Sequence, residues 1–212
     1  MMGCCSSDLR AAMRNNDVSE MERILRESDS DLVNEDTTAD CCLDWCMSCC
    51  GQGYQHPLYT ATMKQNSAMV KLLLDYHAEV NTQNKYGNTP LHAAAGYNNV
   101  ELCNILITHG NADPNLKNGA GETPAFNAVT SLTCRLAEKP DSLQYLLETG
   151  RIDVNARDAK GNSLLHAAAY LDNVKAVELL LKSNVDKEME NHNGQTPLQV
   201  AKLNCKLVLQ SS

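Results

Sequence analysis

Residues 87–101 read "GNTPLHAAAGYNNVE", a stretch that predicts the start, the body and the end of one short helix. The Thr89 hydroxyl can accept a hydrogen bond from a backbone N–H of the first turn, and Pro90 takes the first helical position, where a missing N–H costs nothing. Three alanines keep the helix thin, so that a neighbouring helix can lie close. Gly96 and Asn98 can then adopt the left-handed backbone that ends a helix.

A second helix is expected directly after this one. Val100, Leu102, Ile105 and Leu106 have the spacing that places apolar side chains on one helical face. The two helices form a hairpin that is too small to bury its own apolar face. The hairpin must therefore stack on similar units.

The same pattern returns along the chain, as "HPLYTA" at His56, "TPAFNA" at Thr123, "SLLHAAA" at Ser163 and "TPLQVA" at Thr196. The intervals between successive copies are 33, 34, 40 and 33 residues. A weaker first copy begins at Leu9 as "LRAAMRNNDVSEMERILRES". Repeats of this length indicate an array of stacked units and not an ordinary globular domain.

The period near 33 residues and the T-P-L-H-x-A signature resemble the ankyrin repeat family. The resemblance implies an all-α solenoid of stacked helix-turn-helix units with projecting hairpin loops. We expect an N-terminal tail at 1–7 and a single ankyrin repeat domain over 8–212. The expected units span about 8–35, 54–82, 87–116, 121–156 and 161–190, followed by a half unit at 194–212 and interrupted by a Cys-rich insertion at about 36–53.

Composition narrows the classes of partner. The formal net charge is −8, from 18 basic and 26 acidic side chains, and no basic run is long enough to follow a phosphate backbone. Nucleic acid is therefore not expected as a partner. The sequence shows neither a signal-peptide pattern nor an apolar run of about 18 residues, the length that a transmembrane segment needs. We expect a cytoplasmic protein whose ten cysteines are mostly reduced.

The insertion holds five cysteines and the only tryptophan, at Cys41, Cys42, Trp45, Cys46, Cys49 and Cys50. Cys46 and Cys49 form a C-x-x-C pair. With Cys42 and His56 this pair has spacing compatible with tetrahedral zinc. A single C-x-x-C pair is a weak signal, so a short helix burying these side chains against the first repeats, reversible acylation and redox pairing also remain open.

The N-terminal stretch "MGCCSS", starting at Met2, matches the pattern for N-myristoylation. If translation starts at Met1, Gly3 is not the second residue and cannot be exposed by removal of one methionine. Because the sequence has no transmembrane run, membrane association is expected only if Gly3, Cys4 or Cys5 is acylated. Stable anchoring would need two such lipid groups.

Catalytic motifs are absent from the sequence. It contains no phosphate-binding glycine loop, dinucleotide fingerprint, H-E-x-x-H helix or G-x-S-x-G elbow. His92 and His166 occupy the signature histidine position, where the resemblance implies that they hold a loop and a helix start together. We therefore expect no enzyme activity, no catalytic residue and no cofactor.

The fourth unit is longer than the others. Its extra residues are expected to extend the first helix as far as Lys139, where Pro140 breaks it. Asp141 is then expected to cap the second helix.

The resemblance implies a non-catalytic protein–protein interaction module or adaptor, either of a host cell or delivered by a pathogen as an effector. Partners of such repeats lie in the concave groove formed by the loop tips and the exposed face of each first helix. We expect Tyr86, Tyr97 and Tyr170 to be the main anchors. The alternative is a zinc-binding or redox-responsive protein centred on the Cys41–Cys50 insertion. The expected partner-binding residues are Lys85, Tyr86, Asn88, Tyr97, Glu122, Asn127, Lys160, Asn162, Tyr170, Leu171, His192 and Gln195.

Overall fold

The computed structural model describes residues 3–27, 56–131 and 140–211. Within these ranges the chain is helical, and its one β-type contact is an isolated bridge between Arg157 and Ser163. The helices form consecutive pairs: α1 (Gly3–Asn15) with α2 (Val18–Glu27), α4 (Pro57–Met63) with α5 (Ser67–Asp75), α6 (Pro90–Gly96) with α7 (Val100–Asn104) and its π-helical continuation η2 (Ile105–His109), α8 (Pro124–Thr130) with α10 (Asp141–Glu148), α11 (Leu164–Tyr170) with α12 (Val174–Leu181), and α13 (Pro197–Val200) with α14 (Leu203–Ser211).

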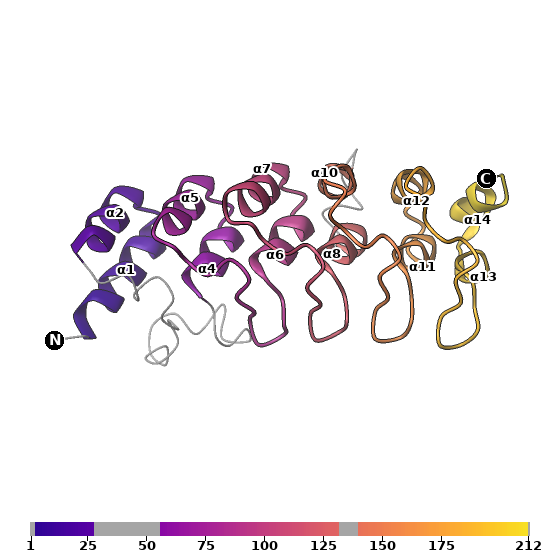
Figure 1. Ribbon diagram of the computed structural model, residues 1–212, viewed down its shortest axis with the longest axis horizontal. Coiled ribbons are helices and arrows are strands. Elements are labelled where there is room, and N and C mark those ends of the chain that lie inside the picture. Colours follow the sequence, from indigo (N-terminus) through magenta and orange to yellow (C-terminus); the bar gives the residue numbers. More distant parts are fainter. Residues whose placement is uncertain (1–2, 28–55, 132–139, 212) are drawn as a thin grey trace.

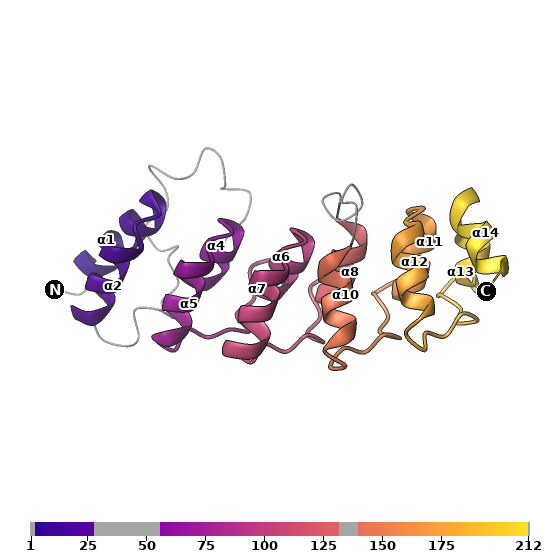
Figure 2. The same cartoon turned by 90° about the horizontal axis from the view of Figure 1, so that it is seen from above.

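The helix pairs stack side by side into an elongated solenoid (Figures 1 and 2). The first helices of the pairs form one row and the second helices form a parallel row, while the hairpin loops project beyond the row of first helices (Figure 1). Buried apolar side chains form one continuous core from Leu9 to Cys205. Leucine, alanine, valine and isoleucine dominate this core, as the scarcity of aromatic residues predicts. The expected all-α solenoid is confirmed.

Three of the first helices, α6, α11 and α13, begin with a reciprocal cap of the kind predicted at Thr89, whereas His56 of α4 and Thr123 of α8 make no side-chain capping bond. The Thr89 hydroxyl accepts from the His92 N–H at 3.4 Å, and the Thr89 N–H donates to His92 Nδ1 at 3.1 Å. Ser163 with His166, and Thr196 with Gln199, repeat this reciprocal arrangement. Three of the second helices use an asparagine instead, and Asn66, Asn99 and Asn173 each accept from the N–H three residues ahead. Local capping chemistry thus marks the helix starts in several units, although neither α8 nor α10 of the fourth unit has a side-chain cap.

The fourth unit differs from its expected form. Helix α8 ends at Thr130, and Ser131 is extended, with φ −61° and ψ 139°. The Ser131 hydroxyl donates to the Gly96 carbonyl of the preceding unit. The first helix therefore ends at Thr130 and does not continue through Ser131 as expected, while residues 132–139 of the expected extension lie outside the described residues. The N-cap of α10 is Pro140 and not Asp141, which is the first helical residue.

The two ends of the chain also differ from expectation. Helix α1 begins at Gly3, within the segment expected to be a tail. The last unit contains two helices and is not a half unit. Asp172 accepts from the backbone N–H of Cys205 at 3.0 Å, and the Cys205 side chain is buried. This contact fixes α14 beside α12, although Leu203 and Leu207 on α14 remain exposed.

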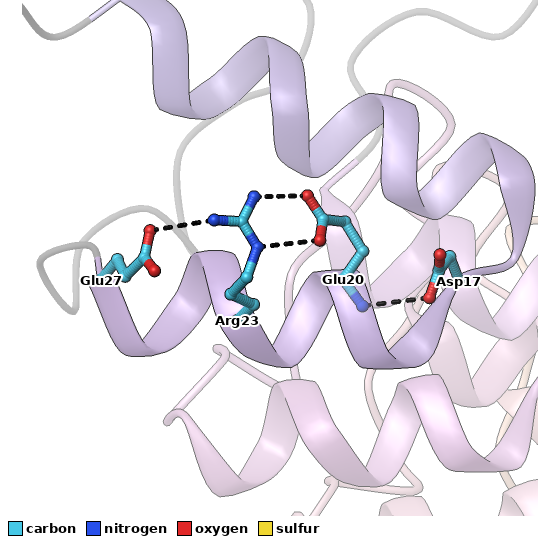
Figure 3. A network of polar contacts seen from close by, with 4 residues as sticks. All are labelled: Asp17, Glu20, Arg23 and Glu27. Atoms are coloured by element: carbon cyan, nitrogen blue, oxygen red, sulfur yellow. Dashed lines mark hydrogen bonds and ion pairs between the residues drawn. The ribbon is translucent and has the colours of Figure 1, made fainter.

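The outer face of α2 is charged (Figure 3). Arg23 pairs with Glu20 at 2.6 Å and with Glu27 at 3.4 Å, and Asp17 accepts from the backbone N–H of Glu20 at 3.0 Å. These side chains are well exposed, so the ion pairs contribute little to stability. Their main effect is to keep the exposed face of α2 solvated.

The projecting loops share one internal design. An Asx side chain at the start of each tip accepts from the N–H groups two and four residues ahead; these residues are Asn84, Asn118, Asp158 and Asn191. The residue three positions ahead is always a glycine with positive φ. Backbone hydrogen bonds then join neighbouring tips, from Gly119 N–H to Tyr86 O, from Ala159 N–H to Ala120 O and from His192 N–H to Lys160 O. The tips form a continuous ladder.

Replacing Gly87 by alanine is expected to destabilise the fold more than the same change at Gly194. Both residues have positive φ, +77° and +69°, so both variants carry the left-handed backbone cost of about 1–2 kcal/mol. A Cβ at Gly87 would also lie 2.6 Å from the Gly119 backbone nitrogen, whereas a Cβ at Gly194 meets nothing within 4 Å. Urea denaturation should show Gly87→Ala losing at least about 1 kcal/mol more than Gly194→Ala. Equal losses would show that the tip ladder contributes nothing to stability.

Candidate functional site

The signature histidines connect each first helix to the loop of the next unit. His92 Nε2 lies 3.0 Å from the Glu122 carbonyl, and His166 Nε2 lies 2.8 Å from the Gln195 carbonyl. Because the Nδ1 atoms accept backbone N–H bonds, the Nε2 atoms carry the protons and donate them to these carbonyls. Burial lowers the pKa of His92 to about 4 and also lowers the pKa of His166. Both histidines are neutral structural groups, as expected.

An open hollow of about 380 Å³ lies on the side of the first helices, across α4, α6 and α8. We call it the central hollow. It lies where three first helices and two tip loops meet, so three consecutive units build it. The described residues that line it are Tyr59, Met63, Asn88, His92, Ala93, Gly96, Tyr97, Asn118, Glu122, Asn127, Thr130 and Ser131.

Four of the predicted partner-binding residues line the central hollow: Asn88, Tyr97, Glu122 and Asn127. The Asn118 amide donates to Asn88 Oδ1 at 2.9 Å and to Glu122 Oε2 at 3.2 Å. The Asn127 amide donates to the His92 carbonyl at 3.3 Å. These side chains are therefore held in place before any partner arrives.

Tyr97 differs from its expected role as an exposed anchor. It is half-buried at the C-terminal end of α6, and its hydroxyl donates to Met63 Sδ at 3.7 Å. Packing against the neighbouring first helix explains this burial. Tyr97 forms part of the wall of the hollow.

The other predicted residues lie outside the hollow. Tyr86 is 52% exposed at a loop tip, with Lys85 Nζ 4.8 Å from the centre of its ring. Tyr170 is 62% exposed at the end of α11, with Lys202 Nζ 5.5 Å from its ring centre. Two further tips carry Lys160 with Asn162 and His192 with Gln195, while Leu171 is half-buried directly after α11.

The other lining residues were not among the predicted partner-binding residues; they are Tyr59, Met63, His92, Ala93, Gly96, Asn118, Thr130 and Ser131. Aligning the repeats places Met63, Gly96 and Thr130 in one column, and Tyr97 and Ser131 in the next. These two columns mark the C-terminal ends of the first helices. Glycine at position 96 leaves space between the larger residues of the neighbouring units, and comparing the columns could have indicated the hollow.

The proposed zinc ligands Cys42, Cys46 and Cys49 lie outside the described residues. His56, the fourth, is the N-cap residue of α4, and its side chain makes no capping bond. Within residues 3–27, 56–131 and 140–211, no group of three metal-ligating side chains gathers. The zinc or redox alternative gains no support from this part of the chain. The same ranges contain no helix long and apolar enough to cross a bilayer.

Comparison with known proteins places the repeat architecture in a family. The family model described as ankyrin repeats in three copies matches residues 9–118 and 131–210. The chain belongs to the ankyrin repeat family. Ankyrin repeats are generally protein–protein interaction modules, and the family is generally non-catalytic.

The chain spans only a small part of the length of the relatives that it matches. The chain is 37% identical over 144 residues to Neurogenic locus notch homolog protein 1 of Homo sapiens, which covers 68% of this chain and 5% of that protein. It is 34% identical over 154 residues to the Nuclear factor NF-kappa-B p105 subunit of Gallus gallus, covering 70% of this chain and 15% of that one. The crystal structure of EF0377, an ankyrin repeat protein, superposes with a TM-score of 0.73 at 22% identity, covering 92% of this chain and 90% of the other. That structure supports the fold alone.

Proposed function

We propose that this ankyrin repeat chain is a non-catalytic adaptor that binds a partner protein across its loop tips and first helices, from the third to the fifth unit. One observation carries the proposal. The exposed aromatic side chains Tyr86 and Tyr170 and the central hollow all lie on this side of the solenoid. Aromatic side chains contribute most of the binding energy at many protein interfaces.

The side formed by the second helices is mainly charged and exposed to solvent. The second helices expose charged side chains such as Lys71, Glu101, Lys175 and Glu178, and α2 carries the ion pairs of Figure 3. Ordering solvated charges costs about as much free energy as the resulting contact provides. Helix α14 differs because it exposes Leu203 and Leu207, but it lies at the far end of the array.

The two exposed tyrosines are partly positioned in advance. Lys85 and Lys202 lie over the rings of Tyr86 and Tyr170, respectively. Such cation–π contacts are worth about 0.5–1 kcal/mol at exposed sites and restrict the ring orientation. A partner that packs on these rings would lose less side-chain entropy on binding.

The proposal keeps the expectation of an intracellular protein. Cys103 and Cys205 are buried in the repeat core, and neither forms a disulfide with another described residue. Buried cysteines outside disulfides suit a reducing compartment, where disulfides rarely form.

The test replaces Tyr86 and Tyr170 together by alanine. Affinity capture followed by mass spectrometry first identifies the main partner of the unmodified chain, and titration with that purified partner then measures the affinity. The double variant should bind at least about tenfold more weakly, which is about 1.4 kcal/mol. Its thermal midpoint should stay close to that of the unmodified chain, because exposed substitutions change stability by less than about 0.5 kcal/mol each.

The matched control replaces Lys175 and Glu178 on α12 by alanine, and it should keep full affinity. Loss of the partner by this control, with binding retained by the tyrosine variant, would place the interface on the second helices and reject the proposal.

A further inference from the structure

The hydrogen-bond pattern of the central hollow indicates which partner group fits it. Three hydroxyls that line the hollow donate their protons within the protein, from Thr130 to the Phe126 carbonyl, from Ser131 to the Gly96 carbonyl and from Tyr97 to Met63 Sδ. The Thr130 and Tyr97 oxygens keep lone pairs that can accept a further hydrogen bond. These two hydroxyls therefore present acceptors to a ligand.

Two side-chain amides that line the hollow also donate hydrogen bonds within the protein. Both N–H groups of the Asn118 side chain are used, one by Asn88 Oδ1 and one by Glu122 Oε2. The Asn127 amide donates to the His92 carbonyl, which leaves its own oxygen as an acceptor. The Asn118 amide therefore offers no N–H to a ligand, and the Asn127 amide has used one of its two.

The charges around the central hollow also favour a cationic group over an anionic one. Glu122 is the one ionised side chain among the described lining residues, and its Oε1 has no donor among them. Because burial holds the pKa of His92 at about 4, that ring contributes no positive charge at neutral pH. No lysine or arginine is among the described residues that line the hollow. A carboxylate or phosphate would meet one negative charge and no lysine or arginine among these residues.

The walls add an attraction for cations. The aromatic residues Tyr59 and Tyr97 line the hollow together with the polarizable sulfur of Met63. A guanidinium or ammonium group over an aromatic face is attracted by the negative charge of that face. A volume of about 380 Å³ is at the small end of ligand pockets and suits a single long side chain.

We propose that the central hollow binds one arginine or lysine side chain of the partner protein, with the Glu122 carboxylate as its ion-pair acceptor. This inference rests on the proposed function, since it assigns a specificity to part of the same surface. Arginine is the better match of the two, because its planar group offers five donors to several fixed acceptors. The negative net charge of the chain favours the approach of such a segment.

The experiment selects binders from a random-sequence peptide library displayed on phage, using the purified chain. The enriched peptides should share a basic residue at one position. A synthetic peptide with arginine there should bind at least about tenfold more tightly than the same peptide with citrulline, which is about 1.4 kcal/mol. Citrulline keeps the shape of arginine and lacks its charge, so this pair isolates the ion pair.

The protein variants locate the effect. Glu122→Gln keeps an oxygen for the Asn118 amide, and it should reduce the arginine-to-citrulline ratio to less than about threefold, or about 0.7 kcal/mol. Glu101→Gln makes the same charge change on the exposed face of α7 and should keep the full ratio. Circular dichroism should show both variants folded.

Two results would overturn the inference: an enrichment without a shared basic residue, or an arginine-to-citrulline ratio that Glu122→Gln and Glu101→Gln leave equally unchanged. If the Tyr86 and Tyr170 double variant still weakens binding in that case, the surface is correct and only the assignment of the hollow fails. If neither Glu122→Gln nor the tyrosine variant weakens peptide binding, both proposals fail.

Discussion

Replacing Leu91 by alanine is expected to lower the free energy of unfolding by about 2–5 kcal/mol. Leu91 is 1% exposed and lies in α6, which packs between α4 and α8. The change removes buried methyl groups and leaves a cavity that the thin, alanine-rich helices cannot fill. Because the units of a solenoid contact only their neighbours, damage in the third unit weakens two interfaces at once.

The measurement is urea denaturation followed by circular dichroism. Leu203→Ala is the matched control, because that leucine is 74% exposed on α14 and should lose less than about 0.5 kcal/mol. Leu165→Ala, in the equivalent buried position of α11, should repeat the large loss. Comparable small losses at Leu91 and Leu203 would show that the core face is wrongly assigned.

Acidification is expected to destabilise the chain through His92. The pKa of this histidine is about 4 in the folded chain and about 6.5 when unfolded, so the unfolded state binds the proton more tightly. The contribution of neutral His92 is fully present above pH 6.5 and is lost as pH falls towards 4. A shift of this size corresponds to about 3 kcal/mol. The physical cause is burial, because a charged imidazole would lose its hydration at a fully buried position.

His92→Gln is the control, because another unit of the chain already has glutamine at this position. Gln199 occupies the equivalent position in the last unit, and its Oε1 accepts from the Thr196 N–H at 2.8 Å. The glutamine variant should keep the helix cap and lose the bond to the Glu122 carbonyl, so we expect it to be less stable at pH 7. Its stability should fall less steeply than that of the unmodified chain between pH 6.5 and 4. Parallel pH profiles for the two proteins would exclude His92 as the titrating group.

Local chemistry made the repeat units predictable from the sequence. A threonine, a proline and a run of alanines define the start and the thickness of α6 within a few residues, so one unit reveals the others. The cap at Thr89 and the structural role of His92 followed from the same short pattern. Interactions confined to one turn of helix are visible in a sequence.

Contacts between units were not predictable in this way. Helix α8 ends early because Ser131 bonds to Gly96, which lies 35 residues earlier in the chain. Helix α14 forms beside α12 because Asp172 binds the Cys205 N–H, 33 residues ahead. The central hollow likewise depends on small and large residues in three successive units, and Tyr97 is half-buried for the same reason.

The ladder of loop tips sets how this solenoid can bend. Backbone hydrogen bonds hold neighbouring tips at a fixed spacing, as between Gly119 and Tyr86 and between Ala159 and Ala120. The row of second helices is spaced by side chains such as Leu106 and Leu146, whose volumes can vary. The spacing of the loop tips is therefore fixed, whereas the spacing of the second helices can change. The curvature of the stack depends on the difference between these two spacings. A larger or smaller side chain between the second helices would change the curvature of the stack. It would thereby widen or narrow the groove formed by the loop tips and the first helices, without altering any residue that a partner is proposed to touch.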